Sequence, residues 1–494
     1  MSVITVNQFS GVSPMTPPRY LNNNTAQVAQ NCPVWLGSLQ PIRGISAITP
    51  DPLTKSGDIA SIYRFDQAET DEKLNWFHWT TDVDVVQGFI AGDTTERTYY
   101  TGDGNPKVTD NALALTGAGT DYPIASYDLG VPKPTGTFTT ALTGTADANT
   151  TAETRVYIFT FVNSWGEEST PYAETDMTPS TENVYPGQSV VVTMPTAPTG
   201  SFNVTKKRIY RSATGTTNTS YFFVAEVPVA QTSYTDSLDG DSLNEVLPSL
   251  TWVQPPSTLK GLVGLANGIM VGFSGNDVYF SEPFRPFAWP VQYMQTVGSP
   301  VVGLGVIDTT VVVLTKGRPY FIQGSHPDSM VMIEADVNQA CISKRSIVSM
   351  GGHVFYASPD GLVGLAPGGS SVVTQSMFDK YTWQTLSPEN LLGCMFENKY
   401  IGFFDTTSGD GGFIYDMAAK TWNFHNIYAV GAFNDLKNDA LYVIKESDKT
   451  LWKWDTGTAL SYTWKSKKFT FPEPKSFSCY RVQAEAYPVT MKIY

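Results

Sequence analysis

The chain has 494 residues, of which 41% are hydrophobic and 16% are charged, and its net charge is −14. This length accommodates two or three domains. An acidic chain is poorly suited to holding nucleic acid by its phosphates, which requires clustered Lys and Arg, although DNA can still slide past it. The aromatic content of 13%, with 41 Gly and 32 Pro, favours short strands joined by tight turns.

The four cysteines, Cys32, Cys341, Cys394 and Cys479, are scattered along the chain. None of them has metal-ligand spacing, and the pattern suits a reducing compartment. The first residues lack the basic and apolar regions of a signal peptide. We expect no membrane-spanning segment, because no apolar run is long enough.

The first two segments of the chain, residues 1–57 and 58–134, differ in amino-acid composition. Residues 1–57 are rich in Pro and Asn and predict an extended N-terminal assembly arm, with one short helix over Ala26–Gln30 capped by Thr25. Residues 58–134 predict a first propeller segment and a linker. Its strands are expected at Ile59–Phe65, Trp76–Trp79 and Thr98–Tyr100.

Residues 135–250 are rich in Thr and resemble a fibronectin type III module. The spacing of the strands suits a β-sandwich of about 100 residues. We expect this module to be inserted in the rest of the fold and to fold alone. Its predicted strands are Thr154–Asn163, Ser189–Met194, Lys206–Ser212, Tyr221–Val227 and Ser233–Thr235.

A repeat dominates residues 251–460 and predicts propeller blades. Each copy has a polar or Gly turn, an apolar strand, a second turn and another apolar strand. The copies begin at Asn267, Asp308, Gly352, Asn398 and Asp439, so the steps are 41, 44, 46 and 41 residues. This period is typical of four-stranded blades, although a long antiparallel sandwich could imitate it. Residues 58–112 could supply one further blade. The fold class expected is therefore all-β, a propeller-like repeat with an inserted fibronectin type III-like sandwich.

Residues 461–494 are expected to close the propeller or to begin a further platform segment. Alternation in Arg481–Ala486 and again in Val489–Tyr494 predicts a strand up to the last residue. We therefore expect either that the polypeptide continues or that a partner covers this strand.

The sequence contains no motif typical of a nucleophile elbow, a phosphate-binding loop or a metal site. Gly272-Phe273-Ser274-Gly275 is too short for a nucleophile elbow, and no glycine-rich phosphate loop follows a strand. The four histidines lack metal-ligand spacing and are expected to pack or to lie at the surface; they are His78, His326, His353 and His425. Asp236, Asp239 and Asp241 miss the alternation of a calcium loop and predict a solvated turn.

Carboxylates and aromatic rings leave a glycan-directed alternative open. Four carboxylates lie near blade turns, Asp360, Asp405, Asp410 and Asp416, but the Asp box of sialidase-type propellers is absent. The tryptophans are expected to fill gaps between blades rather than to stack on sugars; they are Trp289, Trp383, Trp422, Trp452, Trp454 and Trp464. We thus expect no enzyme activity and no catalytic, cofactor-binding or metal-binding residue.

Two stretches resemble phage tail proteins: the first resembles the N-terminal signature of the tail nozzle, or tail tubular, proteins of short-tailed phages, and the second is similar to a blade-edge segment common in tail proteins of this kind. The first runs from Phe9-Ser10-Gly11-Val12 through Ala26–Cys32 to Gly37–Gly44, and the second is Gly275–Pro290. The resemblance implies a virion structural protein, made in the bacterial host cytoplasm. It also implies a hexameric ring at the distal end of the tail. An adaptor ring would lie above it, tail fibres or spikes would be further partners, and DNA would leave through the bore. An acidic bore would let the duplex move because it repels phosphate.

Two other functions remain open at this point. The first is a receptor- or carbohydrate-binding propeller of the tail, and the second is a glycan hydrolase. A ring with a central hole would distinguish the nozzle from a monomeric or trimeric spike or enzyme.

Overall fold

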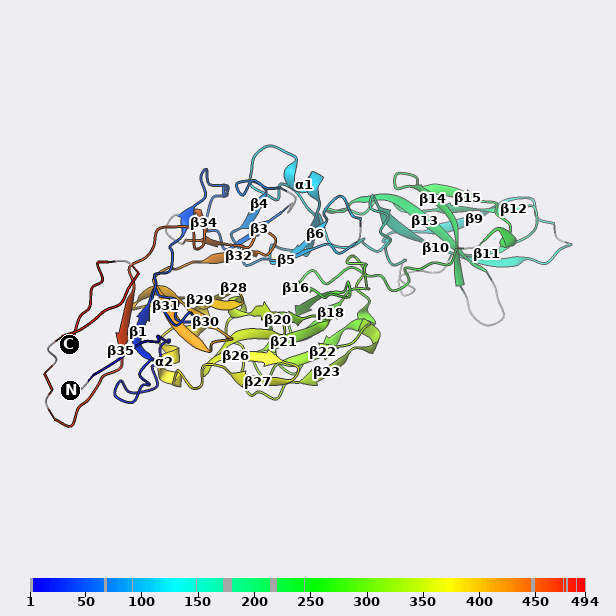
Figure 1. Ribbon diagram of the computed structural model, residues 1–494. Helices are drawn as coiled ribbons and strands as arrows, with labels where there is room; N and C mark the ends of the chain where they lie inside the picture. The colour runs from blue at the N-terminus through cyan, green and yellow to red at the C-terminus, as the bar shows by residue number, and fades with distance from the viewer. Residues whose placement is uncertain are drawn as a thin grey trace.

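The computed structural model describes residues 3–65, 69–90, 92–147, 149–171, 180–213, 220–243, 245–445, 449–473, 475–476, 479–485 and 487–493. In these residues the chain forms nine small sheets, built almost entirely from antiparallel pairs. Seven of the sheets form the blades of a propeller, and the other two form a sandwich that projects from one side (Figure 1). The expected all-β fold, a propeller-like repeat with an inserted sandwich, is confirmed.

We number the blades 1 to 7 in chain order. Blade 1 is β3 (Ser61–Arg64) and β4 (Trp76–Trp79). Blade 2 is β5 (Asp84–Gln87), β6 (Thr98–Thr101), β7 (Lys107–Thr109) and β8 (Tyr127–Asp128). Blade 3 is β16 (Lys260–Gly264), β17 (Met270–Ser274), β18 (Asp277–Phe280) and β19 (Gln295–Thr296). Blade 4 is β20 (Val301–Ile307), β21 (Thr310–Thr315), β22 (Tyr320–Gln323) and β23 (Val331–Glu334).

Blade 5 is β24 (Val348–Met350), β25 (His353–Ser358), β26 (Gly361–Ala366) and β27 (Gly369–Val372). Blade 6 is β28 (Leu392–Phe396), β29 (Lys399–Thr406), β30 (Gly409–Asp416) and β31 (Thr421–His425), extended by β1 (Ala26–Gln30) and β35 (Thr463–Ser466). Blade 7 is β32 (Gly431–Asp435), β33 (Ala440–Ile444) and β34 (Leu451–Lys453), completed by β2 (Ser46–Ala47).

The five repeats are the two middle strands of blades 3 to 7. A residue with positive φ begins four of these hairpins: Gly268 (78°), Asp308 (52°), Asn398 (57°) and Asp439 (47°). Gly, Asn and Asp are the residue types that adopt this conformation most readily. Each repeat therefore consists of a turn that favours Gly, Asn or Asp, followed by an apolar hairpin.

A hydrophobic cluster joins each blade to the next around the ring. Each pair of neighbouring blades, from blades 1 and 2 to blades 6 and 7, shares one hydrophobic cluster. A further cluster joins blade 7 to blade 1. The last junction also contains a buried ion pair, Arg64 to Asp435, with 2.9 Å between nitrogen and oxygen. The seven blades therefore form a closed ring.

Residues 26–30 form a strand, so the predicted helix over Ala26–Gln30 is wrong. β1 runs parallel to β31 and antiparallel to β35, and β2 pairs with β34. A helix of five residues is marginal by itself, whereas two neighbouring strands offer partners to the backbone of β1. The N-terminal segment thus completes blades 6 and 7.

The sandwich lies between β8 and β16. One sheet has the order β11-β10-β13-β14 and the other β15-β12-β9. Their bounds are β9 (Thr139–Gly144), β10 (Glu153–Asn163), β11 (Ser180–Val184), β12 (Gln188–Thr193), β13 (Val204–Ala213), β14 (Ser220–Pro228) and β15 (Ser233–Asp236). The two sheets share one apolar core, and the likeness to a fibronectin type III module stays a prediction.

Other parts of the fold also differ from the prediction. The strands β9 and β11 of the sandwich were not predicted. The short helices α1 (Asn111–Leu115) and α2 (Lys380–Gln384) were not predicted; Asp110 and Asp379 cap them. The strand expected near the end of the chain is not formed in residues 479–485 and 487–493. β35 is the last strand in the described part of the chain.

We predict that Gly11→Ala destabilises the packing of the N-terminal segment on blade 6. Gly11 passes over the backbone of Trp422, and an added Cβ would collide with the Trp422 carbonyl oxygen. Val12 donates its N–H to the same oxygen at 2.9 Å, so the segment cannot move away freely. We expect a loss of about 1–3 kcal/mol in unfolding free energy, measured by denaturant titration. Gly368→Ala, where an added Cβ meets nothing within 4 Å, is the matched control. An equal effect of the two substitutions would contradict the prediction.

Candidate functional site

The histidines that the sequence singled out are dispersed, and two of them are buried. His78 accepts hydrogen bonds at Nε2 from the backbone N–H groups of Thr54 and Lys55, at 3.2 and 3.1 Å. Burial lowers its pKa. His326 is exposed and lies 2.6 Å from Asp328, and His353 stacks on Phe355. These contacts fit packing and surface roles.

His425 lies in the apolar junction between blades 6 and 7. Its ring packs against Phe403 and Trp454, with centroid distances of 5.7 and 5.3 Å. Only 1% of the residue is exposed, and backbone groups of Phe413 and Ile427 lie close to its ring. Burial lowers the pKa of His425 to about 3, so the ring is neutral at physiological pH.

Asp236 is not in a solvated turn, as the sequence had suggested. It is fully buried in the sandwich and accepts hydrogen bonds from Tyr157 Oη and Arg211 Nη1, both at 2.6 Å. Its partner Arg211 is also fully buried. Asp239 is exposed. Asp236 therefore serves the packing of the sandwich rather than a metal loop.

The carboxylates near the blade turns are not gathered into one site. Asp405 and Asp410 are opposite one another on exposed positions of the β29–β30 hairpin. Asp416 accepts a hydrogen bond from the backbone N–H of Ala419. Asp360 is bonded to Gln339 and ion-paired with Lys380, at 2.8 and 2.9 Å.

Asp360 lines an open groove of about 680 Å³ beside α2. The other lining residues are Met15, Gln339, Val372, Gln375, Phe378, Asp379 and Lys380. The groove therefore offers amide and charged groups around one buried aromatic ring. Among the described residues, no three His, Cys, Asp or Glu side chains are grouped so that they could hold a metal ion.

The tryptophans mostly fill the junctions between blades. Trp289, Trp383, Trp422 and Trp454 are buried, with exposures of 7% or less. Trp422 stacks on Phe413 with a centroid distance of 3.9 Å. Trp464 donates its indole N–H to Ser10 O and so holds the N-terminal segment. The packing interpretation is confirmed for the four buried rings.

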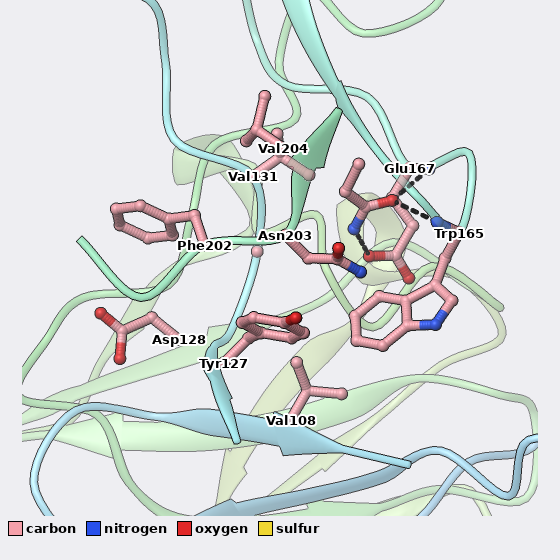
Figure 2. A pocket seen from close by; sticks show the side chains of 11 residues that line it. Val108, Tyr127, Asp128, Val131, Trp165, Glu167, Phe202, Asn203 and Val204 are labelled. Carbon is pink, nitrogen blue, oxygen red and sulfur yellow. Dashed lines mark hydrogen bonds between the residues drawn. The ribbon is translucent and has the colours of Figure 1, made fainter. Parts of the chain in front are cut away.

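A polar joint fixes the sandwich to blade 2. Arg97 forms ion pairs with Glu167 at 2.9 Å and with Asp93 at 2.8 Å, and its guanidinium lies over the Trp165 ring. Trp165 also meets Tyr127 edge-on, as Figure 2 shows beside a cavity of about 10 Å³. Burial raises the pKa of Glu167, and Arg97 partly opposes this. The sandwich is thus docked rather than loosely tethered.

The centre of the propeller contains a second polar cluster, which the sequence analysis missed. Lys344 lies just before β24 of blade 5, yet its Nζ is 2.8 Å from Asp84 and 2.9 Å from Asp82, at blade 2. Arg345 donates hydrogen bonds to the carbonyl oxygens of Ala60 and Val430, which precede blades 1 and 7. Blade 5 is adjacent to none of these blades, so the contacts cross the axis of the ring.

These cross-axis contacts close the channel where the inner strands begin. Lys344 and Asp84 are about a quarter exposed, at 27% and 26%. Burial disfavours the charged ammonium group of Lys344. The attraction of Asp84 and Asp82 outweighs this effect and raises the pKa of Lys344. Only two features of the sequence could have indicated this cluster. One is the adjacent pair of cations Lys344 and Arg345 in a chain with few charged residues, and the other is the spacing Asp82-x-Asp84. An object as wide as duplex DNA cannot pass along this axis.

We predict that the buried neutral His425 makes the fold sensitive to acid. In the unfolded chain its pKa is near 6.5, whereas in the fold it is about 3. Below about pH 6.5 the unfolded state binds the extra proton, so stability falls as pH falls. Between about pH 7 and about pH 4.5, we expect this residue to lower the free energy of unfolding by about 2–3 kcal/mol.

His425→Leu should remove that part of the pH dependence, as measured by denaturant titration at both pH values. His326→Gln, at an exposed position, is the control and should keep the wild-type slope. A His425→Leu variant that loses as much stability on acidification as the wild type would disprove this assignment.

We predict that Lys344→Met destabilises the propeller by about 1–3 kcal/mol, because Asp84 and Asp82 lose their shared cation. Asp84→Asn in the Lys344→Met background should recover part of this loss, since the unpaired, partly buried charge is then removed. Denaturant titration of the two single variants and the double variant gives the coupling energy. Additive effects would show that the cross-axis pair does not act as a unit.

In the part of the chain that the structure describes, no helix has the length and apolarity needed to cross a membrane. No family model and no curated protein matches the sequence.

Several solved structures are distantly similar to the chain. BBS1N, in a complex with ARL6DN soaked with mercury, is 13% identical with a TM-score of 0.29, over 55% of this chain and 88% of that one. The Neurospora crassa Pan2 WD40 domain is 7% identical with a TM-score of 0.31, over 82% and 98%. A functionally unknown protein from Desulfotomaculum acetoxidans is 10% identical with a TM-score of 0.25, over 57% and 86%. Likenesses at these scores support no argument about function.

Proposed function

We propose that this protein is a structural subunit of a short-tailed phage tail, and that copies of it form the nozzle ring through which DNA leaves. The observation that carries the proposal is the role of the residues that resemble the nozzle family. In the N-terminal stretch these residues join the two ends of the chain, and in the second stretch they support the segment that returns from the sandwich to blade 3.

Asn31 shows this role most clearly. It is 4% exposed and has a positive φ of 56°. Its backbone N–H donates to Phe424 O and its carbonyl accepts from Ile42 N–H, at 2.8 and 2.9 Å. Its amide donates to Ser461 O and accepts from Asn426 N–H. One residue of the N-terminal stretch therefore links blade 6 to the segment before β35.

The second stretch supports the point where the chain returns from the sandwich. Trp289 donates its indole N–H to Pro286 O, and its backbone N–H bonds to Val253 O, both at 2.8 Å. Arg285 lies over the Trp252 ring with a distance of 4.8 Å to the centroid. The second stretch thus holds the segment that leads from the sandwich into blade 3.

The blocked channel of the propeller restricts where DNA could pass. Because Lys344 and Arg345 cross the channel, a DNA conduit has to lie between copies of the chain rather than through one propeller. A ring of copies provides such a conduit. The net charge of −14 per copy would keep the duplex from adhering to its wall.

A receptor- or carbohydrate-binding role is the second candidate, and the groove beside α2 favours it. A groove of about 680 Å³ is in the size range of ligand sites. However, Asp360 is already bonded to Gln339 and Lys380, and Asp379 caps α2. Because most of its polar groups already have partners, we rank this function below the nozzle.

We predict that the purified full chain assembles into closed rings with an open centre, six copies being the number that the family resemblance implies. Electron microscopy of the assembled protein measures the symmetry, and the map shows whether acidic side chains face the bore. A basic bore would contradict the conduit. A monomer that is retained on host surface polysaccharide would instead favour the second candidate.

A further inference from the structure

The charge of the chain is unevenly distributed. Residues 1–134, 135–250 and 251–460 have net charges of −6, −7 and −5. Residues 461–494 contain six basic and two acidic residues, so their net charge is +4. One segment therefore has the opposite sign to the rest of the molecule.

This basic segment also exposes large apolar side chains. Tyr480, Tyr487, Met491 and Ile493 have exposures of 71%, 66%, 51% and 66%. The cations Lys468, Arg481 and Lys492 of the same segment are exposed as well. Apolar groups gathered on a short segment with exposed cations are typical of a surface that another protein covers.

The segment begins at a fixed place. β35 pairs with β1, and the backbone N–H of Lys468 donates to Pro18 O at 2.9 Å. Both chain ends lie on the side of the propeller away from the sandwich (Figure 1). The basic segment and the sandwich are therefore at opposite ends of the molecule.

The far tip of the sandwich is acidic. β10 runs from this tip, at Glu153, to the joint near Trp165. Asp147 lies in the loop before β10, and Asp239 lies after β15 near Glu153; Asp147 and Asp239 are exposed. No ion pair joins either of them to another described residue, whereas Glu153 is paired with Arg155.

We propose that the basic segment of one copy, through its described residues 467–473, 475–476, 479–485 and 487–493, docks onto the acidic sandwich tip of the next copy. This inference rests on the proposed ring and specifies its contact. Complementary charges at opposite ends give a head-to-tail interface, which closes into a ring when the rotation between copies is suitable. The exposed apolar side chains favour a protein surface over nucleic acid as the occupant, since phosphates would leave them uncovered.

Reversing charge on each face in turn tests the docking. The tail variant is Lys468→Glu with Arg481→Glu, and the tip variant is Asp147→Lys with Asp239→Lys. The control, Lys73→Glu with Lys260→Glu, changes charge by the same amount as the tail variant, at exposed positions of the propeller. Thermal melting of each variant verifies that it folds.

Sedimentation velocity over a concentration series measures assembly at low and high salt. Either reversal should raise the half-assembly concentration about tenfold at low salt, and combining both should restore most of the affinity. The control should assemble like the wild type. High salt should reduce the difference between wild type and variants.

The outcomes separate the docking from the ring itself. A wild-type chain that stays monomeric overturns the proposed function and the docking with it. A wild-type ring that neither reversal weakens leaves the ring standing and overturns the docking. A combined variant that assembles no better than the single-face variants also overturns it. A tail variant that assembles normally but no longer retains a duplex DNA fragment would assign the segment to nucleic acid.

Discussion

The structure depends on joining the two ends of a ring that has no covalent link. Blade 7 has to be held against blade 1, and the structure does this with the apolar cluster around Trp76 and Tyr442 and with the Arg64–Asp435 pair. Both charged side chains are nearly inaccessible, at 2% and 3%. Desolvating two charges offsets much of their attraction, so the apolar cluster supplies most of the net stabilisation. The ion pair instead fixes which positions of β3 and β32 meet, because a slipped register would leave two buried charges unpaired.

The sequence predicted the parts of the fold that depend on local chemistry. The middle hairpins were found because each combines a turn residue such as Asp308 or Asn398 with apolar strands on both sides. Five of the seven strands of the sandwich were predicted from the same kind of pattern, whereas β9 and β11 were not predicted. The short helix at Ala26–Gln30 was wrong because the partners of this strand lie about four hundred residues away, in β31 and β35. Local propensity contains no information about such partners.

The polar clusters were harder to predict than the sheets. Lys344 and Asp84 are 260 residues apart, and only the closed ring places them across one axis. Asp236 looked like part of a solvated turn because its neighbours in sequence are polar. Its partners Tyr157 and Arg211 are on other strands of the sandwich, and one of them supplies a buried cation. In this molecule the sequence gives the position of each acidic residue in the chain, but the tertiary structure determines whether that residue forms an ion pair.

The distribution of charge connects the rigidity of the subunit to the function we propose for it. Buried rings such as Trp422 and the cross-axis cluster of Lys344 leave the propeller little freedom to open. A conduit formed between such rigid subunits has a wall made only of their outer surfaces. The basic segment would be unfavourable in that wall, because exposed cations would hold the DNA phosphates. Docked on the acidic tip of a neighbouring copy, its cations would be neutralised at the interface, and an acidic surface would remain for the bore. The same contact that assembles the ring would then also keep the bore free of positive charge.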